Sequence, residues 1–227
     1  QTIIALEPKN VVAYLYLATI YAQEKKYNEA EQAYKKLLEI DPDNIIGLYY
    51  YAKTLMLMDR PAEAEHIYSK ITAQRPAFEA AWMELAALYE SQKKYDDAVR
   101  VYRRYLDFNP TRIHFRVKIA EMLMKSGKEG EAVKEFQDVL AIDPDNREVL
   151  TALGFLYYDL KKYDQAAAEF ARLLETKPGD DKLRYLLANA LEQKGDLEAA
   201  KVEYQKVSPT FDLFSNAQIH TAMILKK

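Results

Sequence analysis

The most regular feature of this sequence is the spacing of its apolar and small residues, which recur at intervals of three and four and repeat as a block every 34 residues. Counted from residue 11, they occupy positions 4, 7, 8 and 11 of each block, and a second set occupies positions 20, 24 and 27. In the third block the first set is Trp82, Leu85, Ala86 and Tyr89. Such spacing places side chains on one face of an α-helix. Each block therefore predicts two helices joined by a short turn, near 12–25 and 28–41 in the first block.

Prolines and alanines follow the same interval. Proline stands at 8, 42, 76, 110, 144 and 178, and alanine at 30, 64, 98, 132, 166 and 200, each alanine being followed four residues later by an aromatic residue. Such strict spacing is typical of solenoid arrays, in which each block packs only against its neighbours. The predicted blocks are 11–44, 45–78, 79–112, 113–146, 147–180 and 181–214. Residues 1–10 are interpreted as the end of a preceding block, and 215–227 as the first helix of a truncated seventh block.

The four residues Asp-Pro-Asp-Asn occur twice, at 41–44 and 143–146. Proline disfavours helix in the preceding residue and cannot donate a helical hydrogen bond, so each copy is expected to end one helix. The Asp and Asn that follow can accept hydrogen bonds from the first N–H groups of the next helix. A metal or acid–base role is disfavoured, because an intervening block carries Arg-Pro-Ala-Phe at 75–78 in the same place.

The Trp/Leu/Ala/Tyr stripe, the alanine followed by an aromatic residue and the closing proline together resemble the tetratricopeptide repeat. The third block, AWMELAALYESQKKYDDAVRVYRRYLDFNP at 81–110, follows that repeat closely, and the resemblance covers essentially the whole chain. It implies an all-α fold, a right-handed superhelical solenoid of antiparallel helix pairs. It also implies that the first helices line a concave groove that binds a peptide, a partner helix or another protein. Position 4 departs from the pattern at Arg116 and Arg184.

Composition narrows the class of partner. The 227 residues carry 32 Lys and Arg against 35 Asp and Glu, so no strong positive field attracts nucleic acid. The absence of cysteine excludes disulfides and thiolate metal sites but leaves the compartment open. No stretch approaches 18 uncharged apolar residues, and the first residues lack the pattern of a signal peptide. We therefore expect a soluble chain without membrane insertion, in the cytoplasm or the periplasm.

Catalytic chemistry finds little support in the sequence. His66, His114 and His220 fall in different blocks on different helical faces, so no metal pair or base–nucleophile pair is expected. The six glycines form no phosphate-binding loop. Lysine pairs occupy the predicted turns of alternate blocks, at 25–26, 93–94 and 161–162. These pairs form either a basic ridge for an acidic partner or ordinary hydrophilic turns. We expect no enzyme activity, cofactor or metal within these residues.

A binding face can be placed from the helical angle. At about 100° per residue, positions 2, 5, 9 and 12 of each first helix point away from the packing stripe. This second stripe is mostly apolar in the first three blocks and mixed with charge in the later three. Its candidate binding residues are Leu15, Tyr49, Lys53, Met56, Met83, Phe155, Tyr158, Tyr185 and Asn189.

Five tyrosines have no packing role in the repeat pattern. They are Tyr16, Tyr49, Tyr50, Tyr158 and Tyr185. Rigid aromatic side chains with a polar tip are favoured at binding surfaces. The alternative is that the curvature of the array buries these rings between neighbouring blocks.

Together these features predict a non-catalytic protein–protein interaction scaffold whose groove holds an amphipathic helix or an extended peptide segment. The partner's apolar face would lie over the first three blocks and its polar end over the later three. The chain lacks the Lys, Asn and Arg set with which some members of this family bind the C-terminal carboxylate of heat-shock chaperones, since Leu15 and Thr19 occupy its first two positions. One alternative is the recognition arm of a larger enzyme, such as a glycosyltransferase. Others are an architectural spacer and self-association through the truncated repeat ends.

Overall fold

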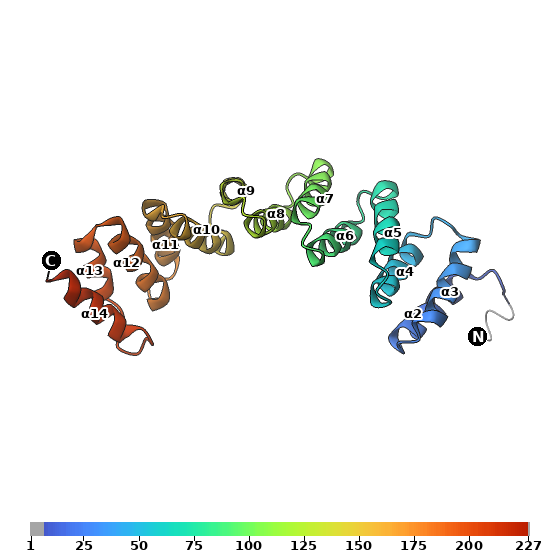
Figure 1. The fold of residues 1–227 in the computed structure, drawn as a ribbon, viewed down its shortest axis with the longest axis horizontal. Coiled ribbons are helices and arrows are strands. Elements are labelled where there is room, and N and C mark those ends of the chain that lie inside the picture. Colours follow the sequence, from blue (N-terminus) through green and yellow to red (C-terminus); the bar gives the residue numbers. More distant parts are fainter. Residues whose placement is uncertain (1–6, 227) are drawn as a thin grey trace. The chain divides into compact units, whose positions relative to one another are not determined.

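The computed structural model describes residues 7–226 and contains, within that range, thirteen α-helices and no strand (Figure 1). The chain divides into two compact units, residues 1–126 and 127–227. The first contains α2 (Val11–Gln23), α3 (Tyr27–Ile40), α4 (Ile45–Leu57), α5 (Pro61–Gln74), α6 (Glu79–Ser91), α7 (Tyr95–Phe108) and α8 (Ile113–Lys125). The second contains α9 (Glu129–Ile142), α10 (Arg147–Asp159), α11 (Tyr163–Thr176), α12 (Asp181–Lys194), α13 (Leu197–Gln205) and α14 (Phe214–Ile224). The predicted all-α repeat solenoid is confirmed.

The helices keep the 34-residue interval. The first helices α2, α4, α6, α8, α10 and α12 begin at residues 11, 45, 79, 113, 147 and 181. Within the first compact unit α2 packs on α3, α4 on α5 and α6 on α7, and within the second α10 packs on α11 and α12 on α13. The helices expected at 12–25 and 28–41 are observed at Val11–Gln23 and Tyr27–Ile40. The grouping of helices into six repeats with partial ends stays a prediction, and most of its segment 1–10 lies outside the described residues.

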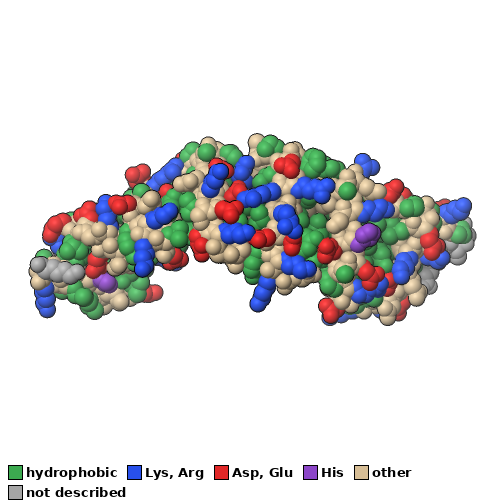
Figure 2. All heavy atoms as spheres, turned by 45° about the horizontal axis from the view of Figure 1, so that its top comes forward, with side chains coloured by type: hydrophobic (Ala, Val, Ile, Leu, Met, Phe, Trp, Pro, Cys, Tyr) green, Lys and Arg blue, Asp and Glu red, His purple; other side chains and the backbone are tan. Residues whose placement is uncertain are grey.

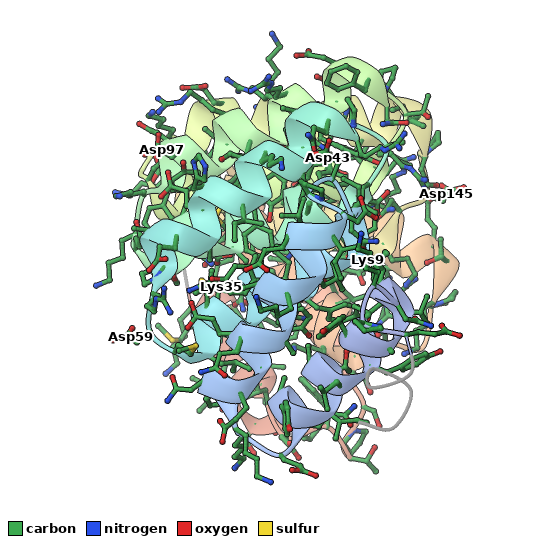
Figure 3. All side chains as sticks on the ribbon, turned by 90° about the vertical axis from the view of Figure 1, so that its right-hand side faces the viewer. Lys9, Lys35, Asp43, Asp59, Asp97 and Asp145 are labelled. Atoms are coloured by element: carbon green, nitrogen blue, oxygen red, sulfur yellow. The ribbon has the colours of Figure 1, made fainter. Side chains whose placement is uncertain are left out.

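Each turn between a first and a second helix contains one residue with a left-handed backbone. These residues recur every 34 positions and are Lys25, Asp59, Lys93, Gly127, Lys161 and Gly195. The left-handed conformation is unfavourable for residues with a side chain, so the turn geometry overrides local preference at four of the six positions. Figure 3 shows Asp59 projecting outward at the turn between α4 and α5. The same position in other turns holds the first residue of each lysine pair, which favours their interpretation as hydrophilic turn residues.

The repeated Asp-Pro-Asp-Asn segment caps a helix, as predicted. The Asn44 side-chain oxygen accepts a hydrogen bond from the Gly47 N–H at 2.8 Å, and Asn146 accepts one from Val149 at 3.1 Å. Each asparagine amide also donates to the aspartate three residues earlier, at 2.9 Å in both copies. These bonds satisfy N–H groups that the start of a helix leaves without partners.

Helix α13 departs from the period. It has nine residues, whereas α3, α5, α7, α9 and α11 have fourteen each. Pro209 stands three residues before position 212, where the period would place a proline, and it prevents the helix from continuing. Helix α14 begins at Phe214, one residue earlier than the period predicts. The sequence-based expectation of a full-length second helix in the sixth block was wrong.

Small residues allow the helices of each pair to approach closely. The alanines at 30, 64, 98, 132, 166 and 200 are fully buried, and the aromatic residues four positions later are at most 2% exposed. Position 8 of each first helix also holds a buried small residue, namely Ala18, Ala52, Ala86, Ala120, Gly154 and Ala188. The aromatic rings fill the space between the helices, as in other closely packed protein interiors.

Two buried glycines offer a matched test of this packing. A methyl group added at Gly154 would lie 2.8 Å from the Phe170 ring, and one added at Gly47 would lie 2.6 Å from the end of Leu37. A leucine methyl can rotate aside, whereas a buried ring cannot. Because alanine gains about 1 kcal/mol of helix propensity over glycine, Gly47→Ala should be neutral or stabilising while Gly154→Ala should cost about 1 kcal/mol. Urea unfolding would measure both, and equal effects would contradict this difference.

Candidate functional site

The solvent face of α2 and α4 carries a row of exposed apolar side chains. Its members are Val12, Tyr16, Ile46, Tyr50 and Leu57, which are between 41% and 67% exposed. These residues occupy positions 2 and 6 of the block on α2 and positions 2, 6 and 13 on α4, which share one helical face. Helices α2 and α4 contact each other, so the two rows form one surface, which we name the first-helix face.

The predicted binding residues of the first compact unit lie beside this face rather than at its centre. Leu15, Tyr49 and Met56 are half-buried and pack against the hydrophobic core, and Met83 is half-buried on α6. Lys53 is exposed. Side chains at positions 5 and 12 therefore turn toward the neighbouring helices. The side chains of the first-helix face, at positions 2, 6 and 13, point to solvent. Their role in binding remains a prediction.

Tyr49 is held by several contacts between neighbouring helix pairs. Its ring lies 5.3 Å from Phe78 in an edge-on arrangement, and 6.2 Å from Tyr68. Its hydroxyl donates to Glu84 Oε1 at 3.2 Å. Burial raises the pKa of Tyr49, and the nearby Glu84 carboxylate raises it further. Tyr49 thus packs between successive blocks, while its neighbour Tyr50 faces solvent.

Beyond the first-helix face, the next first helices α6 and α8 carry charged side chains. Lys53 Nζ lies 3.1 Å from Glu84 Oε1 on α6, which joins α4 to α6 by an ion pair. Glu90 of α6 pairs with Lys125 of α8. On α8 itself, Lys118 Nζ lies 2.7 Å from Glu121. The first compact unit therefore presents apolar side chains over α2 and α4 and paired charges over α6 and α8.

In the second compact unit the predicted residues fall into two groups. Phe155 is 40% exposed and meets Phe170 edge-on at 5.5 Å, while the Tyr158 ring lies 5.4 Å from Tyr163. The structure brings Tyr185 and Asn189 of α12 together around the buried Tyr204. The four residues are half-buried or exposed, and their role in binding stays a prediction.

Tyr204 of α13 is the centre of a polar and aromatic cluster. Its hydroxyl donates to Asn189 and lies 2.8 Å from Glu192 Oε2, and its ring stacks on His220 of α14 at 5.1 Å. Tyr185 meets the Tyr204 ring at 5.6 Å. Burial and the bonded Glu192 carboxylate raise the pKa of Tyr204. This cluster links α12, α13 and α14, and its buried ring explains the positions of Tyr185 and Asn189 by packing.

The three histidines stand in separate surroundings. His66 is exposed on α5, His114 Nε2 lies 3.1 Å from Glu79 Oε1, and His220 Nδ1 lies 2.8 Å from Glu192 Oε2. Across residues 7–226 no three His, Cys, Asp or Glu side chains are grouped so as to hold a metal ion. In the same range no helix is both long and apolar enough to cross a bilayer.

Sequence reasoning placed Val12 and Ile46 on the outward stripe, at position 2, but did not select them as candidate binding residues, and it missed Leu57 at position 13. The repeat pattern alone does not say which of the outward rows is covered by the next helix pair. Tyr16 and Tyr50 did give a signal, because they had no packing role in the repeat. Both are exposed in the structure, at 67% and 41%.

Comparisons with known proteins agree with this geometry. The sequence profile of a tetratricopeptide repeat matches residues 1–45, 21–88 and 157–223. A second profile, that of the cytochrome c-type biogenesis protein H TPR domain, matches residues 73–184.

Among curated proteins, TPR repeat-containing protein YpiA of Bacillus subtilis is 26% identical over 130 residues, which is 57% of this chain and 31% of that protein. Protein O-mannosyl-transferase TMTC1 of Homo sapiens is 25% identical over 125 residues, which is 53% of this chain and 14% of that protein. The chain thus spans less than half the length of these relatives.

Among solved structures, YrrB is described as a TPR protein with an unusual peptide-binding site. It matches 86% of this chain and 96% of its own with a TM-score of 0.58 and 18% identity. At this level of identity the likeness concerns the fold alone.

Proposed function

The chain belongs to the tetratricopeptide repeat family, and from this premise we propose that it is a protein-interaction scaffold whose first-helix face binds an amphipathic segment of a partner protein. The observation that carries the proposal is the row Val12, Tyr16, Ile46, Tyr50 and Leu57, exposed on two adjacent helices. A run of exposed apolar side chains bordered by charge is typical of a surface that another molecule covers.

The polarity of the surface indicates how a partner would lie on it. Apolar side chains of the partner would contact α2 and α4, where desolvation is favourable. Its charged residues would lie over α6 and α8, where Lys53, Glu84, Glu90 and Lys125 already form ion pairs at the surface. A helix with apolar residues at intervals of three and four, followed by a charged end, fits this order. YrrB, which shares this fold, is described as having an unusual peptide-binding site, so the fold is compatible with a peptide ligand.

Tyr50→Ser provides the central test. The Tyr50 ring is exposed and outside the buried core, so its loss should leave the fold intact. Because a few central aromatic residues carry most of the binding energy of an interface, we expect binding to weaken by about 1–2 kcal/mol, which is about fivefold to thirtyfold. The measurement is fluorescence anisotropy with peptides selected from a random displayed library against the wild-type chain.

Ile142→Ser is the matched control, because Ile142 is exposed to a similar degree, 48% against 41% for Tyr50, but lies on α9 in the second compact unit. Selected peptides should share apolar residues at intervals of three and four and should bind the control variant normally. If the peptides lack that pattern, or if both variants bind equally well, the first-helix face is not the binding surface.

A second candidate function is suggested by the relative TMTC1, whose name is that of a transferase. In this alternative the repeats form the recognition arm of a larger enzyme whose catalytic domain lies outside these residues. Sequencing the complete open reading frame tests it directly. A frame that encodes only repeats would exclude this alternative.

Self-association through the ends of the array also remains a prediction. Ile219 and Met223 of helix α14, and Leu225 directly after it, are each more than half exposed. Sedimentation velocity over a range of concentrations would detect it, and a constant monomer mass would exclude it.

A further inference from the structure

A hollow lies in the first compact unit, between the second helices α5 and α7. It encloses about 500 Å³ and is lined by Ser69 and Thr72 of α5, by Trp82, Leu85 and Tyr89 of α6, and by residues of α7. At about 100° per residue, the three α6 side chains project from the side of that helix opposite to Ala80, Glu84 and Ala87. The hollow is therefore separate from the first-helix face. We name it the α5–α7 groove.

Three arginines border this groove from α7. Arg100, Arg103 and Arg104 are spaced by three and four residues, so they share one face of the helix, and all three side chains are exposed. Figure 2 shows Lys and Arg side chains gathered over α7 among hydrophobic ones. Two carboxylates also line the groove: Asp97, which is labelled in Figure 3 and pairs with Arg100, and Asp107.

The floor of the groove is rigid and aromatic. The Trp82 indole N–H donates to the Pro76 carbonyl at 3.0 Å, and the ring is only 2% exposed. Tyr105 meets it edge-on at 5.9 Å. The Arg104 guanidinium lies over the indole with its carbon 5.9 Å from the ring centre. A guanidinium stacked on a fixed ring is held in place before any ligand arrives, which reduces the entropy lost on binding.

The repeat fold does not require arginines at these places. The same three positions, 22, 25 and 26 of the block, hold Gln32, Lys35 and Lys36 on α3, and Val202, Gln205 and Lys206 on α13. On α11 they hold Ala168, Ala171 and Arg172. Because such different side chains occupy the same positions in other blocks, the fold does not require the three arginines on α7. The cluster also stands in a chain whose net charge is −3, where a surplus of cations is not the general trend.

From these observations we propose that the α5–α7 groove binds an acidic peptide segment, with glutamate or aspartate side chains on Arg103 and Arg104 and an apolar side chain against the groove floor. The planar guanidinium matches a carboxylate with two parallel hydrogen bonds, which lysine cannot form. Leu85 and Tyr89 add apolar surface beside the indole. The Tyr89 hydroxyl is already bonded to Glu65 at 2.7 Å, so the ring and not the hydroxyl is offered to the ligand.

The carboxylates Asp97 and Asp107 make the groove selective. They face a ligand from the same helix as the arginines and repel a continuous polyanion such as a phosphate backbone. A peptide carries its charges on separate side chains, which can be placed on the arginines while the rest of the segment avoids the aspartates. An acidic peptide is therefore favoured over nucleic acid.

Trp82 provides a direct readout, because it is the chain's one tryptophan and lies under Arg104. The probe is a short synthetic peptide of glutamate and leucine with blocked ends and no aromatic residue. We expect it to change the Trp82 emission in a saturable way, with affinity falling as salt is added. The same peptide with lysine in place of glutamate, and an oligothymidylate of similar charge, should leave the emission unchanged.

The variants separate the arginines from general charge. The double variant Arg103→Gln/Arg104→Gln should weaken binding about tenfold or more, and Arg103→Lys/Arg104→Lys should weaken it by a smaller factor because charge remains without the planar fork. Lys36→Gln/Lys206→Gln is the control, since it removes two charges from position 26 of other blocks. It should change the affinity less than about twofold. Because Arg104 lies over Trp82, replacing Arg104 can itself change the Trp82 emission. The affinities of the variants are therefore measured by calorimetry, which does not depend on that emission.

The proposal is overturned if the glutamate peptide does not bind, if oligothymidylate binds equally well, or if the control variant loses as much affinity as the arginine variant. This test is independent of the first-helix face. Tyr50→Ser should leave binding of the glutamate peptide unchanged. A glutamate peptide that does not bind the α5–α7 groove would therefore leave the proposed function of the first-helix face intact. Likewise, a negative result for the first-helix face would leave the α5–α7 groove proposal intact.

Discussion

Replacing Ala98 by phenylalanine is expected to destabilise the first compact unit by about 3 kcal/mol and to leave the second nearly unchanged. Ala98 is fully buried at the point where α7 approaches α6, and the facing residue Ala86 is fully buried as well. A ring cannot be accommodated there unless the two helices separate. Because each helix pair of a solenoid contacts only its neighbours, the damage should stay local. Hydrogen exchange should show faster exchange in α6, α7 and α8 first.

Ala62→Phe is the control for this prediction. Ala62 is exposed on α5, so a ring at that position projects into solvent and should cost little. Helices α11 and α12 of the second compact unit serve as an internal reference within the same sample. Equal loss of protection in α6 to α8 and in α11 to α12 would mean that the array unfolds as one cooperative body.

The period of the sequence predicted the helices well because the repeat depends on local and nearest-neighbour packing. The alanine and aromatic positions specify which face of each helix is buried, and the prolines specify where each pair ends. The exception has a local cause too. Pro209 was visible in the sequence, but the regularity of the other five pairs outweighed it in the prediction of α13.

The candidate site was predicted less well, because exposure depends on how far each helix pair rotates against the next. Tyr49 and Tyr50 are adjacent on α4, so a rotation of this helix about its axis decides which of the two rings faces solvent. The hydrophobic pattern of the sequence is compatible with either orientation. In the structure Tyr49 packs against Phe78 and Tyr68, and Tyr50 is 41% exposed. The α5–α7 groove could not be predicted from the repeat either, since Trp82 looks in the sequence like an ordinary packing residue.

Buried charge is the other feature that the repeat pattern does not reveal. Glu31 carries an ionisable side chain, yet the residue is only 9% exposed. Its carboxylate meets three donors from three helices: Lys35 at 2.8 Å on α3, the Tyr51 hydroxyl at 2.9 Å on α4, and Arg60 at 2.8 Å at the start of α5. These contacts cross from the first helix pair to the second, so they stabilise the joint between the two pairs.

We expect Glu31→Gln to remove up to about 3 kcal/mol of stability at neutral pH. Burial by itself raises the pKa of Glu31, but the hydrogen bonds from Lys35, Arg60 and Tyr51 outweigh it and lower the pKa from 4.5 to about 2. A carboxyl group whose pKa is lower in the folded state stabilises the fold when it is ionised. This contribution is complete above the unfolded pKa of 4.5 and is lost as the pH falls from there toward about 2.

Urea unfolding of the wild type and of Glu31→Gln from pH 7 down to the acid limit of stability would measure this effect, because the difference between the two isolates one carboxylate from all others. The difference should be largest above pH 4.5 and should shrink as the pH falls toward about 2. Glu63→Gln is the control, since Glu63 also pairs with Arg60, at 2.6 Å, but is exposed. Its effect should be much smaller because water screens the pair. A difference that stays constant with pH would show that Glu31 acts through its shape and not through its charge.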